Sequence, residues 1–450
     1  MLVSIALAIA LVVDATPGPT PQPAQTSLLL APSISIARSA QSPGMMTALW
    51  TKQTSWTSND KLTDVPLLQG GRGNLYIRQK DVIAAVDVRT GVERWSKTLP
   101  DIYEIAANDD FLVASLEDGR LISLRPASGA VVWNLKLAER PLLAFVRGVL
   151  LVNLDGIDPK RGTAIWSSRT LEKYGEPVWL ARPPHDAGAS VLIGGSASGT
   201  IGHNILIALD STSGKTLWTA DTDAFVGIAA GLVYMQDTWP RDGSAVYLDV
   251  NGQKNAETRK EYVLNPDPAM NGDGDRFTDT VPIRVTTDSI LIALNGWFYR
   301  YPRVNPMAAR PLRVASDGTF LGGPIDGWYY FGGPAGLTLV NFAGTTASKR
   351  RIPLPGGQSG PMLVDDSRVY VGSGSGRLIE IDTKARTVTR MTPAQCKLPH
   401  ELAMLDGVLL AACDDERKPP TPAPCFDQPS GERYCPTPDR RLKVVGFRVN

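Results

Sequence analysis

Short apolar runs alternate with turn residues along most of this chain. Val82 to Val86 and Leu206 to Leu209 each end at an aspartate, and Leu112 to Leu116 is followed by Gly119. A strand bounded by Gly, Asp or Asn is the usual meaning of such a pattern. No long apolar period of 3.6 residues appears, so helices are not expected. The pattern predicts an all-β protein of many short strands, and the 42 Gly and 35 Pro supply the turns that it needs.

The strand pattern contains an internal repeat. Two segments, Ala85 to Trp95 and Ala208 to Trp218, share Ala, Asp, Gly and Trp at identical spacing. The Asp can accept backbone N–H bonds and begin a turn, the Gly can take a positive φ, and the Trp can pack on a neighbouring unit. We interpret the repeat residues as structural, with ligand stacking by Trp as the alternative: Asp87, Gly91, Trp95, Gly129, Trp133, Gly162, Trp166, Asp210, Gly214 and Trp218.

Less regular units continue this rhythm to the C-terminus, roughly every 40 residues, which is the period of a β-propeller blade. The spacing widens at residues 253–287, which we interpret as an insertion. A β-sandwich or a two-domain β protein is the alternative fold, and the repeated Gly-x-x-x-Trp spacing disfavours it.

The signature Ala-x-Asp-x-x-x-Gly-x-x-x-Trp resembles the quinoprotein-like (PQQ-type) β-propeller repeat, here in a non-enzymatic branch similar to assembly factors. The resemblance implies a propeller of eight four-stranded blades. Nine remain the alternative, because the unit from Leu150 to Trp166 is short. It also implies that an N-terminal strand near Trp50 closes the ring beside the C-terminal blade, which removes exposed sheet edges.

The chain divides into three expected regions. Residues 1–15 form an apolar leader that we interpret as a signal peptide, although no Lys or Arg precedes its apolar run. Residues 16–46 are a Pro- and Ser-rich linker, and residues 47–450 are a single propeller. We therefore expect export to the periplasm or the extracellular space, with no transmembrane span in the mature chain.

All four cysteines lie near the C-terminus, at Cys396, Cys413, Cys425 and Cys435. An even count in an exported chain indicates disulfides. Four cysteines allow three pairings; we prefer Cys396–Cys413 and Cys425–Cys435, the latter within a cysteine-bearing loop at residues 413–440. A zinc site is disfavoured because no C-x-x-C spacing occurs.

One segment has the composition of a calcium loop. Asn271, Asp273, Asp275 and Asp279 place oxygen ligands at alternating positions in a Gly-rich stretch. Arg276 and Pro282 occupy positions where an EF-hand needs Gly and Glu, so a solvated insertion is the alternative. Calcium is the one metal that the sequence suggests.

Composition and motifs limit the function mostly by exclusion. With 46 Lys+Arg against 45 Asp+Glu the chain has a net charge of +1, which argues against nucleic acid as the main partner. The resemblance allows a quinone- and calcium-dependent dehydrogenase, but such enzymes often carry a disulfide between adjacent cysteines, and none are adjacent here. We therefore expect no quinone cofactor and no catalytic residues.

The leading hypothesis is a non-catalytic, monomeric, extracytoplasmic scaffold that binds a protein partner, in the cell envelope or outside the cell. The alternatives are the dehydrogenase and a sensor of small ligands or glycans.

Overall fold

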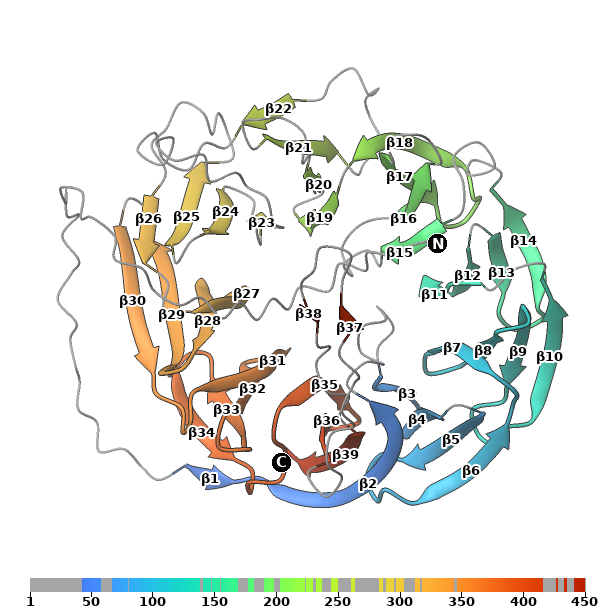
Figure 1. The fold of residues 1–450 in the computed structure, drawn as a ribbon, viewed down its shortest axis with the longest axis horizontal. Coiled ribbons are helices and arrows are strands. Elements are labelled where there is room, and N and C mark those ends of the chain that lie inside the picture. Colours follow the sequence, from blue (N-terminus) through green and yellow to red (C-terminus); the bar gives the residue numbers. More distant parts are fainter. Residues whose placement is uncertain are drawn as a thin grey trace.

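The computed structural model describes residues 43–57, 67–79, 81–137, 141–146, 148–153, 155–168, 177–181, 190–197, 203–222, 224–229, 232–236, 244–249, 260–263, 283–285, 289–294, 297–302, 312–315, 318–343, 346–415, 426–427, 433–434 and 441–449. Strands dominate this part of the chain, as the alternating pattern predicts, and they form antiparallel sheets arranged in a ring (Figure 1). Within this part, no helix has the length and apolarity that crossing a bilayer requires.

In blades 1 to 8 four consecutive strands run in order from the inside of the ring to its rim, whereas the outer strand of blade 9 comes from the N-terminal segment; we number the blades along the chain. Blades 1 to 3 contain β3 (Gln69–Gly71), β4 (Asn74–Gln79), β5 (Val82–Asp87), β6 (Glu93–Thr98); β7 (Ile102–Ala107), β8 (Leu112–Leu116), β9 (Arg120–Leu124), β10 (Val131–Lys136); β11 (Leu143–Val146), β12 (Val149–Val152), β13 (Asp155–Asp158) and β14 (Thr163–Ser167).

Blades 4 to 6 follow in the same order. They contain β15 (Pro177–Ala181), β16 (Ser190–Ala197), β17 (His203–Asp210), β18 (Thr216–Thr222); β19 (Ala224–Ala229), β20 (Leu232–Gln236), β21 (Ser244–Asp249), β22 (Lys260–Val263); β23 (Ile283–Val285), β24 (Ser289–Leu294), β25 (Trp297–Pro302) and β26 (Leu312–Ala315). Strands β22 and β23 both lie within residues 253–287, the stretch that we interpreted as an insertion.

Blades 7 to 9 complete the ring. They contain β27 (Thr319–Ile325), β28 (Trp328–Gly333), β29 (Gly336–Ala343), β30 (Thr346–Ile352); β31 (Gln358–Asp365), β32 (Arg368–Ser373), β33 (Leu378–Asp382), β34 (Thr387–Met391); β35 (Pro399–Leu405), β36 (Val408–Asp414), β39 (Arg441–Arg448) and β2 (Thr47–Thr57). A small pair, β37 (Phe426–Asp427) and β38 (Arg433–Tyr434), lies between β36 and β39 in sequence.

The described residues thus form nine sheets of at least four strands, one more than the preferred eight and equal to the alternative. The difference arises at the short unit around Leu150 to Trp166. Its strands are only four or five residues long, but they form a complete sheet, β11 to β14.

The ring is closed by the N-terminal segment, which confirms the closure predicted near Trp50. Strand β2 pairs antiparallel with β39, with Thr51 opposite Val445. Just before it, β1 (Gly44–Met45) pairs parallel with β34 of blade 8. Between them the Met46 side chain is buried, and its N–H donates to the Met391 carbonyl at 2.8 Å. One short segment therefore ties two neighbouring blades together.

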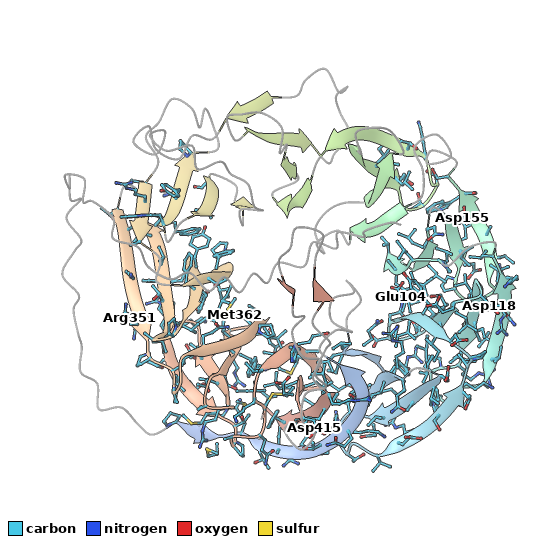
Figure 2. The ribbon with its side chains drawn as sticks, in the orientation of Figure 1. Glu104, Asp118, Asp155, Arg351, Met362 and Asp415 are labelled. Atoms are coloured by element: carbon cyan, nitrogen blue, oxygen red, sulfur yellow. A yellow bond between two sulfur atoms is a disulfide. The ribbon has the colours of Figure 1, made fainter. Side chains whose placement is uncertain are left out.

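The hydrophobic core lies in the joints between blades. The second strands are almost wholly apolar and buried, as in Leu112–Leu116 and Val408–Asp414. One cluster joins Tyr76 and Ala85 of blade 1 to Ile105 and Leu124 of blade 2. Figure 2 shows the side chains filling the spaces between adjacent sheets in the well-described part of the ring.

Candidate functional site

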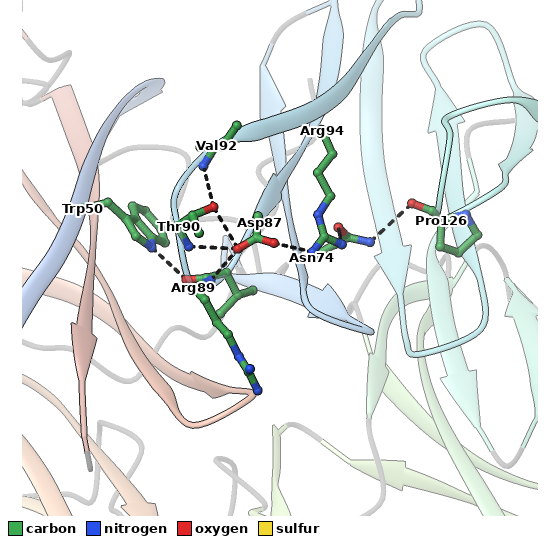
Figure 3. Close-up of polar contacts among 9 residues, drawn as sticks. Trp50, Asn74, Asp87, Arg89, Thr90, Val92, Arg94 and Pro126 are labelled. Carbon is green, nitrogen blue, oxygen red and sulfur yellow. Dashed lines mark hydrogen bonds and ion pairs between the residues drawn. The ribbon is translucent and has the colours of Figure 1, made fainter.

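The predicted repeat residues meet at the outer side of the joints. In four joints between described residues, the indole N–H of an outer-strand Trp donates to a carbonyl in the third turn of the next blade. The four bonds are Trp50 to Val88 at 2.7 Å, Trp95 to Pro126 at 2.9 Å, Trp133 to Pro159 at 2.8 Å and Trp166 to Ser211 at 3.2 Å. The first of them joins the closing strand to blade 1, so the same contact operates across the ring closure (Figure 3).

The repeat glycine makes this contact possible. Gly91 has φ +71°, and a Cβ there would lie 2.5 Å from the Trp50 ring. Gly129 and Gly162 have the same relation to the indoles of Trp95 and Trp133. A residue with a side chain would be strained in this conformation and would push the indole away. The Gly and the preceding blade's Trp are therefore two halves of one contact.

The repeat aspartate holds the turn in shape. Asp87 Oδ1 accepts the N–H groups of Arg89 and Thr90 at 3.0 and 2.8 Å, and Asp210 accepts those of Thr212 and Ser213. Burial of Asp87 opposes its ionisation, but hydrogen bonds from Arg94 and Thr90 outweigh it and lower its pKa. Hydrogen bonds from Thr212 and Ser213 lower the pKa of Asp210 to about 2.

In blade 8 a pair of charged residues stands where the repeat has Ala facing Trp. In blade 1, Ala85 faces Trp95 across the sheet; at the matching positions of blade 8, Glu380 faces Arg390. Arg390 donates to the Val449 carbonyl of blade 9, as an indole does elsewhere. It also holds the buried Glu380 carboxylate through Nε and Nη2, the latter at 2.6 Å.

Two further groups complete this charged joint. Arg368 lies 3.6 Å from Glu380 and donates to the Val449 carbonyl at 3.2 Å. Burial of Glu380 opposes its ionisation, but hydrogen bonds from Arg390 and Thr389 and the nearby cations keep its pKa below the ordinary value. Burial raises the pKa of Tyr370, which lies opposite Glu380, to about 12. No sequence signature reveals this joint, because the repeat motif is absent from it.

A second set of contacts links the inner strands. Glu401 accepts the N–H of Leu67 at 2.7 Å, Gln69 donates to the Ile105 carbonyl at 2.8 Å, and Glu104 accepts the N–H of Leu143 at 3.1 Å. Each contact joins an inner strand to the backbone of the next blade. Figure 2 shows Glu104 toward the inside of the ring and Asp118 at its rim. These side chains escaped sequence analysis because they contact partners far along the chain.

The cysteine prediction is confirmed in its first half. Cys396 and Cys413 form a disulfide with their Cα atoms 5.3 Å apart, and both are fully buried. The Cys396 N–H also donates to the Gly376 carbonyl of blade 8, so the bridge lies at a joint. Cys425 and Cys435 lie outside the described residues.

The candidate metal ligands Asn271, Asp273, Asp275 and Asp279 also lie outside the described residues. Within the residues that are described, no group of three His, Cys, Asp or Glu side chains is placed to hold a metal ion. His400 Nε2 lies 2.7 Å from Asp414 Oδ1, close to the disulfide, and no sequence pattern predicted this contact.

Comparison with known protein families supports the interpretation of the repeat. The family model described as PQQ_2, outer membrane protein assembly factor BamB, matches residues 47–135. No curated protein matches the chain in sequence.

Similar solved structures include BamB from Moraxella catarrhalis, at 15% identity and a TM-score of 0.42, covering 90% of this chain and 98% of that one. The quinohemoprotein alcohol dehydrogenase ADHIIG from Pseudomonas putida HK5 has 12% identity and a TM-score of 0.44, covering 90% and 76%. A europium-containing methanol dehydrogenase has 12% identity and a TM-score of 0.44, covering 90% and 93%. At this level of similarity these structures carry no argument about activity. The similarity in sequence is thus to the PQQ-type repeat, over residues 47–135.

Proposed function

We propose that this chain is a non-catalytic, extracytoplasmic propeller that binds other proteins as a scaffold in the cell envelope. The main observation behind the proposal is that the chain's buried or inner-strand glutamates serve to join neighbouring blades. Glu104, Glu380 and Glu401 all hold one blade to the next or support a residue that does so. Groups engaged in this way stiffen the ring, and a stiff ring presents its rim with little loss of conformational entropy on binding.

Two further observations support the proposal. The model matching residues 47–135 is described as an assembly factor, which by its name acts on proteins. The buried Cys396–Cys413 disulfide is typical of an oxidising compartment, and this supports a place outside the cytoplasm.

The carboxylates described on the inner strands fit a quinone–calcium site poorly. Glu104 and Glu401 accept backbone N–H groups of the adjacent blade, so their oxygens are already engaged. The disulfide joins cysteines 17 residues apart, not adjacent ones. The proposed function therefore includes no catalytic step through a quinone.

The test is affinity capture from the envelope fraction of the source cell, with the full chain as bait. We expect a reproducible partner protein, and its absence across replicates would contradict the scaffold. In parallel, the purified chain is mixed with pyrroloquinoline quinone and Ca²⁺, and binding and dye-linked oxidation of alcohols and sugars are measured. Saturable quinone binding with turnover would establish the dehydrogenase instead.

Two finer points belong to the same proposal. We expect a monomer, which light scattering after size exclusion would test. A calcium site at Asn271, Asp273, Asp275 and Asp279 remains a proposal, and isothermal titration with Ca²⁺ on the wild type and on Asp273→Asn would decide it.

A further inference from the structure

The outer strands share a bulge. In blades 1, 2, 3, 4, 8 and 9 the pairing of the third and fourth strands shifts by one residue just before the Trp position. A β-bulge redirects the extra side chain and is retained where that direction matters. The extra residues of the six blades are, in that order, Arg94, Val132, Ile165, Leu217, Thr389 and Leu49.

Three consecutive blades carry an exposed apolar residue at this position. Val132 is 48% exposed, Ile165 51% and Leu217 39%, and Val131 beside Val132 is 48% exposed. Their strands β10, β14 and β18 follow one another along the rim (Figure 1). We call these four residues the bulge row. They make up half of the eight large hydrophobic side chains that are exposed among the described residues, so this exposure is concentrated in one place.

Cations accompany the bulge row. The turn of blade 3 approaches Trp133 through Gly162, and it carries the exposed Lys160 and Arg161. The turn of blade 4 likewise carries the exposed Lys215.

The acids of these two turns bind residues of their own turn. The Asp158 carboxylate accepts the Lys160 N–H at 2.8 Å and lies 3.8 Å from Arg161, and Asp210 binds Thr212 and Ser213. Arg161 is thus paired with Asp158, whereas the exposed Lys160 and Lys215 pair with no acid among the described residues, which favours an acidic partner.

Blade 9 shows what the bulge position accepts. There the corresponding residue, Leu49, is only partly exposed and packs against an apolar cluster that includes Leu67 and Val88 of blade 1. In blade 9 the chain itself therefore covers the bulge residue with apolar side chains.

We propose that the bulge row binds an extended segment of a partner protein in which apolar side chains alternate with Asp or Glu. The apolar side chains would cover Val132, Ile165 and Leu217, and the acids would face Lys160 and Lys215. The proposal rests on the scaffold function and names the surface and the partner chemistry that would serve it.

The experiment uses the full chain and a fluorescein-labelled peptide in which Leu alternates with Glu, with binding measured by fluorescence anisotropy. The variant is Val132→Ser/Ile165→Ser/Leu217→Ser. The matched control is Val364→Ser, on β31, where the side chain is 44% exposed. We expect the triple variant to bind at least ~10-fold more weakly than the wild type and the control, with unchanged melting temperatures, because contact residues at an interface centre dominate affinity.

Several results would overturn the inference. They are equal binding by the triple variant, no binding of the Leu–Glu peptide, equal binding of a peptide in which Leu alternates with Lys, and binding to phosphatidylglycerol vesicles without binding to the peptide. The capture experiment separates this inference from the scaffold itself. If the triple variant recovers the same partner as the wild type, the bulge row is excluded while the scaffold stands. If the wild type recovers nothing, the scaffold fails.

Discussion

Replacing Arg390 should destabilise the charged joint between blades 8 and 9. In Arg390→Met, the Glu380 carboxylate keeps its burial and loses the hydrogen bonds from Arg390 Nε and Nη2. Breaking a buried ion pair in this way typically costs 3–5 kcal/mol. Because Arg368 remains 3.6 Å away, we expect the free energy of unfolding to fall by about 3 kcal/mol at pH 7.

The destabilisation by this substitution should depend on pH, because Glu380 can be protonated. Folding lowers the pKa of Glu380, so its ionised form stabilises the wild type fully above the ordinary glutamate pKa of 4.5, and this contribution is lost as the pH falls through the lower pKa of the folded state. In Arg390→Met the burial of the carboxylate is less well compensated, and protonation relieves it. The destabilisation by the substitution should therefore shrink between pH 7 and pH 4.

Denaturation in guanidinium chloride, followed by tryptophan fluorescence, measures both effects. The double variant Glu380→Ala/Arg390→Met is the control, because it removes the charge together with its partner. Replacing both members of a buried pair by apolar residues is often neutral. We expect the double variant to recover most of the lost stability. A single variant as stable as the wild type, or a double variant no better than the single, would refute this account of the joint.

Three other substitutions test other joints by the same denaturation assay. Trp50→Phe keeps most of the ring and leaves the Val88 carbonyl without its donor, so it should cost about 1–3 kcal/mol, and a cost near zero would deny that bond a role. Gly162→Ala, whose Cβ would meet the preceding blade's indole, should cost more than Gly148→Ala, which has φ +83° and open space around it; equal costs would mean that only backbone strain matters. Replacing both cysteines of the Cys396–Cys413 disulfide by Ser should cost about 3 kcal/mol, given the 17-residue separation, and an unchanged unfolding midpoint in the reduced wild type would contradict this.

The repeat could be predicted from the sequence because it is local. Asp87, Gly91 and Trp95 lie within one turn and one strand, and each residue type has a single physical role there. The closing strand could be predicted for the same reason, since the residues around Trp50 match the strand that follows a repeat turn.

The charged joint and the inner contacts could not be predicted in this way. Glu380 and Arg390 replace the repeat's Ala and Trp by residues that are individually unremarkable on a strand, and only the register reveals the equivalence. The inner contact from Glu401 reaches Leu67 across 334 residues, and no local spacing announces it. The blade count depended on a unit whose strands are unusually short.

The closing strand also sets the order of events during synthesis. The Thr54 hydroxyl donates to the Leu442 carbonyl, 388 residues away, so β2 is made early and must wait for β39 before it can pair. Pairing across so long a separation is slow, and unpaired edges are prone to wrong partners meanwhile. Until residues 441–448 arrive, both β2 and the open edge of β36 are exposed. A truncation that removes only β39 should therefore produce a chain that associates with other copies of itself through those edges.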